Sequence, residues 1–560
     1  MLTLIFATLT LKLYIIREQI GDARIIRSDP TSSLVRKFQK EISRLKKEKK
    51  IDVRTFHRLY PSDAVPPRLY GLLKAHKPEK NYPMRTVVST IGTVSHGTSA
   101  FLVDLIQPTL DKNEIRIKNS SSFVEEAKTW DISQNEVQVS FDVVALYPSV
   151  PIAKAIDVMM DIISDDFEDV KTRTSLDICD IRILLQLCLA KCYFLWQDQL
   201  YEIDDTGPIG LSLMVVIAEG FLQFIERNAI NEALQVGIHL KTYRRYVDDS
   251  HARFDSGYED FLKILNSQDE NIQYTVETQD DDSTLSFLDI TLINDGSGKY
   301  GFKVFRKPAI TNVMLKPSSS VDPKMIEGVF KGFLARAKRI CSDKFLHDEI
   351  EFLIKVFDKN GHNAKKLRMI ADDYTKDSDT ISEEINADVE GVEKQPVACI
   401  PWVPILGPKL RKLLKKRGVK TVFTAGRNLK DILCNHKTKL APNSYPGIYK
   451  LSCECGGAYI GETKRKISVR IAEHEKDIFH GRWEKSGASE HAKACTSSFK
   501  WIEAETMAIE SNYMRRKVRE ALEIRKSKRT TDAASLNRDQ GNILTNSSWD
   551  VLLGKMASII

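Results

Sequence analysis

Residues Lys241–Phe254 read KTYRRYVDDSHARF. Two runs typical of β-strands, Tyr243–Val247 and Ser250–Phe254, flank the acidic pair Asp248 and Asp249. This pattern predicts a β-hairpin with both carboxylates at its tip. Paired aspartates occur at four other places in the chain, so it is the strand context that makes this pair informative.

A second strand pattern, Val137–Phe141, ends at Asp142 ahead of a turn at Pro148. Two strand ends that present carboxylates side by side can hold two Mg²⁺ ions about 4 Å apart. Mg²⁺ keeps part of its water shell and binds phosphates, so such a pair suits the attack of a 3′-hydroxyl on a nucleotide phosphate. The alternative is that these aspartates only form turns, for which Asp is well suited.

Length and composition limit the class of protein. The chain has 560 residues, so we expect two or more domains. With 42% hydrophobic and 28% charged residues it reads as globular. The net charge of +7 suits a polyanionic partner better than a cationic one. Most of the nine cysteines stand singly, which predicts reduced thiols in an intracellular compartment.

Four segments together carry a family resemblance. They read YGLLKAHKPEKNYPMRTVVS (70–89), SFDVVALYPSVP (140–151), YRRYVDD (243–249) and LSFLDITL (285–292). In this order they resemble the reverse transcriptases of Penelope-like retroelements, over about Asp29 to Ile370. FRKPAITNVML (305–315) resembles the next block of that family, and Lys324–Arg339 its helical segment on the thumb side.

The resemblance implies an α+β right-hand polymerase with fingers, palm and thumb. Asp142 and Asp248 are then the Mg²⁺ ligands of the palm, with Asp249 supporting them. Residues assigned to the incoming nucleotide are Lys74 and Arg85, which would grip the triphosphate, and Tyr147, an aromatic gate against the wrong sugar.

One segment departs from the family. Where the family usually reads Gly-Ser-Pro-Leu-Ser-Pro, this chain has Gly210-Leu211-Ser212-Leu213-Met214-Val215, without either proline. That segment normally shapes the floor beneath template and nucleotide. The departure therefore favours an alternative interpretation, a decayed or domesticated copy that only binds nucleic acid.

The C-terminal part holds a second set of motifs. Gly447-Ile448-Tyr449 and, ten residues past Tyr449, Tyr459-Ile460-Gly461 resemble the signature of GIY-YIG endonucleases. By resemblance the catalytic set is Tyr449, Tyr459, Arg470, Glu520 and Asn537, and His474 is a candidate proton acceptor beside it. In this chemistry a tyrosine relays protons with the attacking water, Arg470 stabilises phosphate charge and Glu520 holds one Mg²⁺. Packing of aromatic residues in a sheet is the alternative for the tyrosines.

A candidate metal site lies between the two tyrosines. Penelope-like nucleases carry a cysteine pair here and two downstream histidines, which are read as a zinc site. This chain offers Cys453, Cys455, His480, His491 and Cys495. The first two with His491 and Cys495 make a thiolate-rich tetrahedral set for Zn²⁺. The alternative is a group of reduced surface thiols.

Changes of charge along the chain mark the expected domain boundaries. Asp372–Glu393 holds nine acidic residues against one lysine, which predicts a linker, and Lys409–Lys420 is a basic amphipathic helix suited to a phosphate backbone. Met1–Ile16 predicts a buried strand or helix, or a start trimmed into a longer gene; it is too short to span a bilayer. The expected units are a helical N-terminal segment (1–55), fingers and palm (56–300), a helical segment resembling a thumb or helix-turn-helix (301–371), an acidic linker (372–398), a basic helical connector (399–444) and the nuclease (445–550).

The sequence thus predicts an RNA-directed DNA polymerase fused to a DNA endonuclease that nicks the target to prime synthesis. The expected cofactors are two Mg²⁺ in the palm, one in the nuclease, and Zn²⁺ at the cysteines. The expected partners are template RNA, primer and target DNA, and dNTPs, with no membrane; the oligomeric state stays open. We expect an intracellular protein that enters the nucleus at least transiently. Telomerase-like end maintenance without a nuclease is disfavoured by the complete tyrosine–arginine–glutamate–asparagine set.

Overall fold

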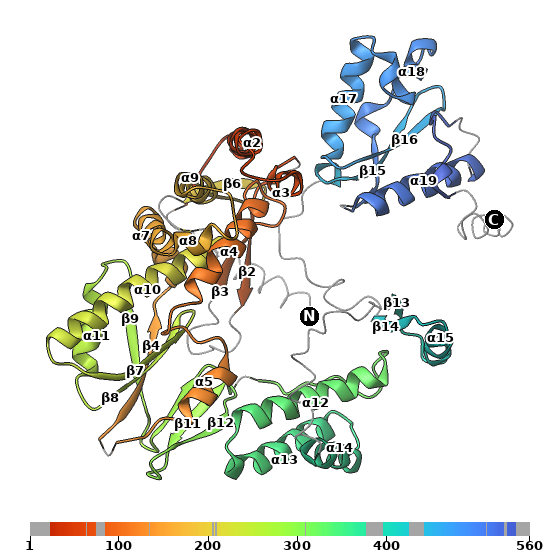
Figure 1. The fold of residues 1–560 in the computed structure, drawn as a ribbon. Coiled ribbons are helices and arrows are strands. Elements are labelled where there is room, and N and C mark those ends of the chain that lie inside the picture. The colour runs from red at the N-terminus through yellow and green to blue at the C-terminus, as the bar shows by residue number, and fades with distance from the viewer. Residues whose placement is uncertain are drawn as a thin grey trace, which may run out of the picture.

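The computed structural model describes most of the chain, and the fold is mixed α+β (Figure 1). The predicted roles of Met1–Ile16 and Lys74 fall outside the described residues. Those residues are 23–62, 64–73, 84–133, 135–203, 207, 210–308, 310–376, 396–424, 442–510, 512–530 and 535–544.

A four-stranded sheet, in the order β7-β8-β4-β9, carries the aspartates. Its strands are β4 (Val137–Val143), β7 (Leu240–Tyr246), β8 (Asp249–Phe254) and β9 (Tyr274–Thr278). The predicted hairpin is confirmed, because β7 and β8 pair antiparallel across a turn at residues 247–248. Alternating residues of β4 and β8 reach the main core, where β-branched and aromatic side chains suit a pleated surface.

Helices cover one face of this sheet (Figure 1). The longest described helix, α10, buries residues all around its circumference, so it lies inside the core rather than at its surface. The helices of this part are α2 (Thr31–Lys47), α3 (Val53–Leu59), α4 (His96–Leu110), α5 (Ser120–Ala127), α6 (Leu146–Ser149), α7 (Ile152–Asp165), α8 (Phe167–Val170), α9 (Ile178–Leu189), α10 (Ser212–Gln235) and α11 (Tyr258–Ser267).

A five-stranded sheet forms the neighbouring part, in the order β1-β6-β5-β2-β3. The segment Pro61–Pro83, which the sequence predicts to be rich in turns, contributes a strand to it. The strands are β1 (Arg24–Ile25), β2 (Arg68–Leu73), β3 (Met84–Ser89), β5 (Cys192–Trp196) and β6 (Gln199–Ile203).

The run FLDITLI, predicted as one strand, is broken in the structure. β10 (Thr284–Phe287) and β11 (Ile290–Asn294) form a tight hairpin, and β12 (Tyr300–Val304) completes a three-stranded sheet. Leu288 has a left-handed backbone (φ 57°), and Asp289 pairs with Arg336 at 2.6 Å. The chain therefore turns where apolar alternation alone favours a continuous strand.

Three helices follow, as the basic segment Pro323–Ala371 predicts. α12 (Pro323–Ile340), α13 (Asp343–Lys359) and α14 (Ala364–Lys376) share a core of their own, in which Phe330 and Phe357 meet edge to face. α14 runs five residues into the segment 372–398 that the sequence assigns to a linker.

The basic connector is not a simple helix. Residues 396–424 form β13 (Val397–Pro401), α15 (Leu406–Lys415) and β14 (Lys420–Thr424), with the two strands parallel. The predicted helix over Lys409–Lys420 ends early because Gly418 takes a left-handed conformation (φ 71°), after which β-branched residues form β14. The lysines and arginines mask this strand pattern in the sequence.

The C-terminal unit has a small antiparallel sheet in the order β16-β15-β17. Its elements are β15 (Gly447–Ser452), β16 (Ala458–Thr463), α17 (Ile467–Phe479), α18 (Gly487–Ala494), β17 (Glu505–Ile509) and α19 (Tyr513–Thr530). Tyr449 and Leu451 pack on the α17 side of the sheet, whereas Ile448 and Ile460 pack on the α19 side with Ile524. None of the described helices is long and apolar enough to cross a membrane.

Candidate functional site

The first site lies at the end of the four-stranded sheet. Asp142 of β4 stands directly opposite Asp249 of β8, and Asp248 lies in the β7–β8 turn beside them. The Asp142 and Asp248 side chains are exposed. Burial raises the pKa of Asp249 to about 6, and the negative charges of Asp142 and Asp248 add to the rise. The three carboxylates therefore repel one another, and a divalent cation bound between them would reduce that repulsion.

Hydrogen bonds hold the Asp249 side chain and the backbone of Asp248 in place. Ser140 Oγ donates to Asp249 at 3.0 Å, and the backbone N–H of Val143 donates to the carbonyl of Asp248 at 3.3 Å. Carboxylate oxygens are the ligands that Mg²⁺ prefers, and two exposed ones from adjacent strands leave room for water and phosphate. The residues present thus fit a Mg²⁺ site.

A buried ion cluster supports the turn from below. Arg245 is fully buried and donates two hydrogen bonds to the Glu219 carboxylate (2.8 and 3.0 Å) and one to Glu226 (2.8 Å). Its Nη1 also donates to the carbonyl of Val247 at 3.0 Å. Val247 has a left-handed backbone (φ 60°), which is strained for a β-branched residue. We call Arg245, Glu219 and Glu226 the Arg245 cluster; it ties the turn before Asp248 to α10.

The predicted nucleotide contacts are placed only in part. Tyr147 lies on the short helix α6, which follows β4, and it packs partly against the main core. Arg85 lies on β3 opposite Leu72 of β2. The structure leaves the roles of Tyr147 and Arg85 as predictions.

The segment that departs from the family packs tightly. Gly210 has φ 110°, and a Cβ there would meet the carbonyl oxygen of Val88 at 2.3 Å. Thr90 Oγ1 donates to the carbonyl of Gly210 at 3.2 Å, and α10 begins at Ser212 directly after the buried Leu211. The helix that carries the glutamates of the Arg245 cluster therefore starts two residues after the contact of Gly210 with β3.

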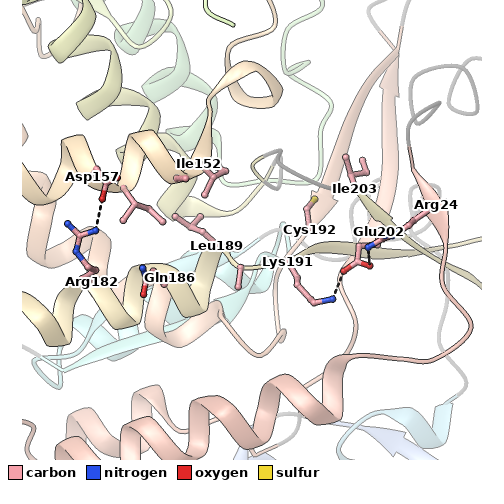
Figure 2. Close-up of a pocket in the computed structure, with 13 residues that line it drawn as sticks. Arg24, Ile152, Asp157, Arg182, Gln186, Leu189, Lys191, Cys192, Glu202 and Ile203 are labelled. Atoms are coloured by element: carbon pink, nitrogen blue, oxygen red, sulfur yellow. Dashed lines mark hydrogen bonds and ion pairs between the residues drawn. The ribbon is translucent and has the colours of Figure 1, made fainter. Parts of the chain in front are cut away.

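A separate cavity of about 460 Å³ opens between α7, α9 and the β5–β6 hairpin (Figure 2). None of Asp142, Asp248 and Asp249 lines it. The charged side chains in Figure 2 pair with one another, Arg182 with Asp157 and both Lys191 and Arg24 with Glu202. Each charged side chain of the lining thus already has an ionic partner within it.

The second site brings the two predicted tyrosines together in the C-terminal unit. Tyr449 on β15 and Tyr459 on β16 have ring centroids 6.4 Å apart, and both rings lie beside His474 of α17. Tyr449 Oη lies 2.8 Å from His474 Nε2, and His474 Nδ1 lies 3.0 Å from Ser486 Oγ. Burial lowers the pKa of His474 to about 4, so the imidazole is neutral near pH 7 and Nε2 can accept the tyrosine proton.

Arg470 and His474 share the inner side of α17, as their spacing predicts. Arg470 is half-buried, pairs with Glu473 at 3.0 Å and stabilises the ionised form of Tyr449. Asn537 does something else. Its amide oxygen accepts from the N–H of Ile460 and its amide nitrogen donates to the carbonyl of the same residue. Asn537 thereby holds the final described segment against β16, which is a positioning role.

Glu520 of α19 reaches the edge of β16, where its carboxylate accepts the backbone N–H of Glu462 at 3.0 Å. Burial raises the pKa of Glu520. Lys517 Nζ lies 3.2 Å from both Glu462 and Glu520, and Arg516 donates to Glu462 at 2.8 Å. Two carboxylates at one edge fit a divalent cation, and here they also hold two basic side chains.

The predicted zinc ligands converge. Cys453 and Cys455 lie in the β15–β16 turn, His491 on α18 and Cys495 at its C-terminal cap. Their ligand atoms all lie within 4.8 Å of one another; Sγ of Cys453 and Cys495 are 3.9 Å apart, and Cys455 Sγ is 3.3 Å from His491 Nε2. Tetrahedral Zn–S bonds of about 2.3 Å put ligands about 3.8 Å apart. The four side chains therefore fit Zn²⁺, and His480 is not needed.

Sequence reasoning missed the Arg245 cluster, Glu462 and Lys517. Glu219 and Glu226 were detectable as two acidic residues seven positions apart, on one face of an otherwise apolar helix. Lys517 stands three positions before Glu520, a spacing that puts the two side chains on the same face. Glu462 carried no such signal, since only the sheet edge brings it to α19.

Comparison of the sequence with family models finds one match. Residues 313–368 match the animal helix-turn-helix domain and cover α12, α13 and the start of α14. No curated protein matches the sequence.

Comparison with solved structures finds nucleic-acid polymerases. A telomerase from Candida albicans, in complex with a fragment of telomeric RNA, is 9% identical with a TM-score of 0.40; 63% of this chain and 66% of that one align. The BmCPV RNA-dependent RNA polymerase at elongation state is 12% identical with a TM-score of 0.36, over 62% of this chain and 31% of that one. The Sicinivirus 3Dpol RNA-dependent RNA polymerase is 10% identical with a TM-score of 0.35, over 58% and 71%. The alignments thus leave a third or more of the first two proteins unmatched, and with TM-scores this low the function has to be argued from the chain's own residues.

Proposed function

We propose that the chain is an RNA-directed DNA polymerase of a Penelope-like retroelement, coupled to a GIY-YIG endonuclease that nicks DNA to prime synthesis. The observation that carries the polymerase is the register of β4 on β8, which sets Asp142 opposite Asp249 with Asp248 in the adjoining turn. In this proposal the protein acts inside the cell and, at least transiently, in the nucleus.

Asp142 and Asp248 would hold two Mg²⁺ ions, which supply Lewis-acid stabilisation of the phosphate and of the attacking 3′-hydroxyl when bound. Asp249 has a less exposed side chain and orients the pair through its bond from Ser140. The Arg245 cluster keeps the turn in its strained conformation, so that the carboxylate of Asp248 does not have to be ordered at each turnover. Tyr147 would pack against the sugar.

In the nuclease, the chain's own residues move the proton of the attacking water. Tyr449 donates its hydroxyl proton to Nε2 of neutral His474, which leaves the phenolic oxygen to accept a proton from water. The pKa of Tyr449 is raised well above its usual value by burial, so the residue relays a proton rather than standing as a phenolate. Arg470 stabilises charge on the phosphate, and Glu520 would hold one Mg²⁺.

The four ligands of the β15–β16 turn and α18 would hold Zn²⁺, which would fix the turn that joins the two tyrosine strands. Release of a metal by a chelator, followed with a zinc dye, tests this part. About one equivalent per chain is expected from the wild type and none from Cys495→Ser.

The polymerase is tested by primer extension on poly(rA)–oligo(dT) with Mg²⁺. We expect extension by the wild type and none by Asp142→Asn. Asp281→Asn is the matched control, because Asp281 is an exposed aspartate of another acidic run and its substitution should leave extension unchanged.

The nuclease is tested by plasmid nicking, with Tyr449→Phe as the inactive variant.

The competing proposal, a domesticated copy that only binds nucleic acid, rests on the altered segment after Gly210. It would be favoured if the wild type binds RNA in a salt-dependent manner but neither extends nor nicks. The tight packing of Gly210 against Val88 fits both proposals, because a copy that only binds nucleic acid must fold as well.

A further inference from the structure

Lys517 lies where two carboxylates of the nuclease site converge. Its ammonium nitrogen is 3.2 Å from Glu462 Oε1 and 3.2 Å from Glu520 Oε2. Both carboxylates are largely shielded from solvent, with side-chain exposures of 15 and 16%. The lysine thus bridges a strand-edge carboxylate and a helix carboxylate that are 58 positions apart in the sequence.

The charges of this group balance. Arg516 binds the other oxygen of Glu462 at 2.8 Å, and its side chain is only 4% exposed. Two carboxylates and two cations therefore give a neutral group with no net attraction for a third cation. A divalent ion that binds both glutamates has to compete with the ammonium of Lys517, since that group already lies between them.

We propose that Lys517 is a built-in counter-ion of the nuclease metal site, so that the metal binds tightly only when DNA phosphate draws the ammonium away. The proposal rests on the proposed nuclease function of Glu520 and adds Glu462 as its companion ligand. Arg516 is too buried to leave, whereas Lys517 has a flexible stem and a side chain that is 35% exposed.

The consequence is positive coupling between metal and DNA. A phosphate near Lys517 gives the ammonium group a new ionic partner, so that it leaves both glutamates. The negative charge of the two carboxylates, no longer neutralised by Lys517, then attracts the divalent ion. By linkage, a bound metal must strengthen phosphate binding by the same factor. Such coupling keeps the site metal-poor, and so unreactive, until a DNA target is present.

The test measures Mn²⁺ binding to the full chain by the loss of the free-ion EPR signal. It uses Asp142→Asn/Asp248→Asn as background, so that the palm does not bind the ion. Without DNA, adding Lys517→Met should raise Mn²⁺ affinity about tenfold or more, because one positive charge leaves the site. Lys517→Gln, tested alongside, should act the same way if the effect is one of charge.

A short duplex with a cleavage-resistant phosphorothioate backbone completes the test. It should raise Mn²⁺ affinity in the background chain but not in either Lys517 variant. Lys500→Met is the matched control, because Lys500 pairs with Glu503 at the same i,i+3 spacing in the same unit, and it should change nothing. Unchanged affinity in folded Lys517→Met and Lys517→Gln, as judged by thermal melting, would overturn the proposal.

If Glu520 has no role as a metal ligand of a nuclease, the Mn²⁺ affinities follow a different pattern. If Glu520→Gln, added to the Lys517→Met chain, leaves Mn²⁺ affinity as it was, Glu520 is not a metal ligand. The proposed nuclease centre would then fail together with the counter-ion. If Glu520→Gln abolishes Mn²⁺ binding and Lys517→Met has no effect, only the counter-ion proposal fails.

Discussion

The two sites of this chain place their charges in opposite ways. Asp142 and Asp248 are exposed at the end of the four-stranded sheet, and the buried Arg245 ties the turn before Asp248 to α10. In the C-terminal unit, Glu520 is shielded and already bound to Lys517. The first site thus presents exposed carboxylates, whereas the second pairs its shielded carboxylate with a basic side chain of the same helix.

This difference follows from the elements that carry each site. Asp142 and Asp249 lie opposite each other at the end of the central strand pair, and α10 supports the adjoining turn through Arg245. An edge strand such as β16 leaves backbone N–H groups free for Glu520 of α19. The helix that supplies the carboxylate supplies the lysine too, one turn away.

The largest effect should come from removing one carboxylate at each site. Asp248→Ala should lower primer extension by roughly 10³-fold or more, since a metal ligand contributes several kcal/mol to the transition state, and should leave plasmid nicking intact. Glu520→Ala should do the converse. Loss of both activities in either variant would show that the two sites are not independent.

Next in size is the Arg245 cluster. Arg245→Met leaves Glu226 buried without its cation and Glu219 with only the more distant Arg116 at 3.6 Å, and should reduce the free energy of unfolding by about 3–5 kcal/mol. Arg244→Met is the control at the neighbouring position. Its partner Glu126 is partly exposed, so the loss should stay below about 1 kcal/mol. Urea denaturation measures both, and equal losses would contradict the supporting role.

Gly461 tests the packing of the two tyrosines. A Cβ at this position would meet Tyr449 Oη at 2.5 Å and Tyr459 Cε1 at 2.9 Å. Gly461→Ala should therefore cost about 1–3 kcal/mol of stability, displace the Tyr449 hydroxyl from His474 and reduce nicking, but not extension. Gly332→Ala is the matched control, because nothing lies within 4 Å of its added Cβ. Normal nicking by Gly461→Ala would show that the hydroxyl position tolerates a shift.

The smallest effect is a dependence of stability on pH. The pKa of His474 falls from 6.5 in the unfolded chain to about 4 in the folded one. The unfolded state therefore binds a proton more readily, and stability is lost as the pH falls below 6.5. Between pH 7 and 5 this amounts to about 2 kcal/mol, and below pH 4 no more is lost.

Thermal melting of the wild type and His474→Gln across this range measures the difference. The variant should be less stable at pH 7 but should show a weaker pH dependence. An equal slope in both chains would mean that the imidazole is not the group that titrates.

The sequence predicted those parts of the sites that lie within one or two local patterns. The hairpin around Asp248, the strand ending at Asp142, the helix that pairs Arg470 with His474, and the four converging cysteine and histidine ligands all follow from local periodicity or family motifs. The predicted helix over Lys409–Lys420 ends at Lys415 in the structure, because the basic run continues beyond the helix end, past Gly418, to the first residue of β14.

Contacts between distant elements could not be predicted from the sequence, because a local pattern does not specify a partner far away in the chain. The carboxylates of α10 give no hint that a buried arginine from β7 joins them, because an isolated Glu on an apolar helix has no defined partner in the sequence. Asn537 matches its motif as a catalytic residue, but only the parallel bridge between Ala458 and Ser535 shows that its amide serves the backbone of β16.

The pairing of β4 with β8 also bears on how the chain folds. Ser140 and Asp249, which bond at 3.0 Å, are 109 positions apart, and five helices and two strands of another sheet lie between β4 and β8 in the chain. The chain has to lose the entropy of closing this long loop before the strand pair contributes any favourable free energy. The contact therefore belongs to the late, slow part of folding. During synthesis, the acidic centre cannot assemble until β8 has left the ribosome, whereas α2 and α4 can form before it. The three aspartates are therefore not brought together in the nascent chain before the rest of the sheet can hold them.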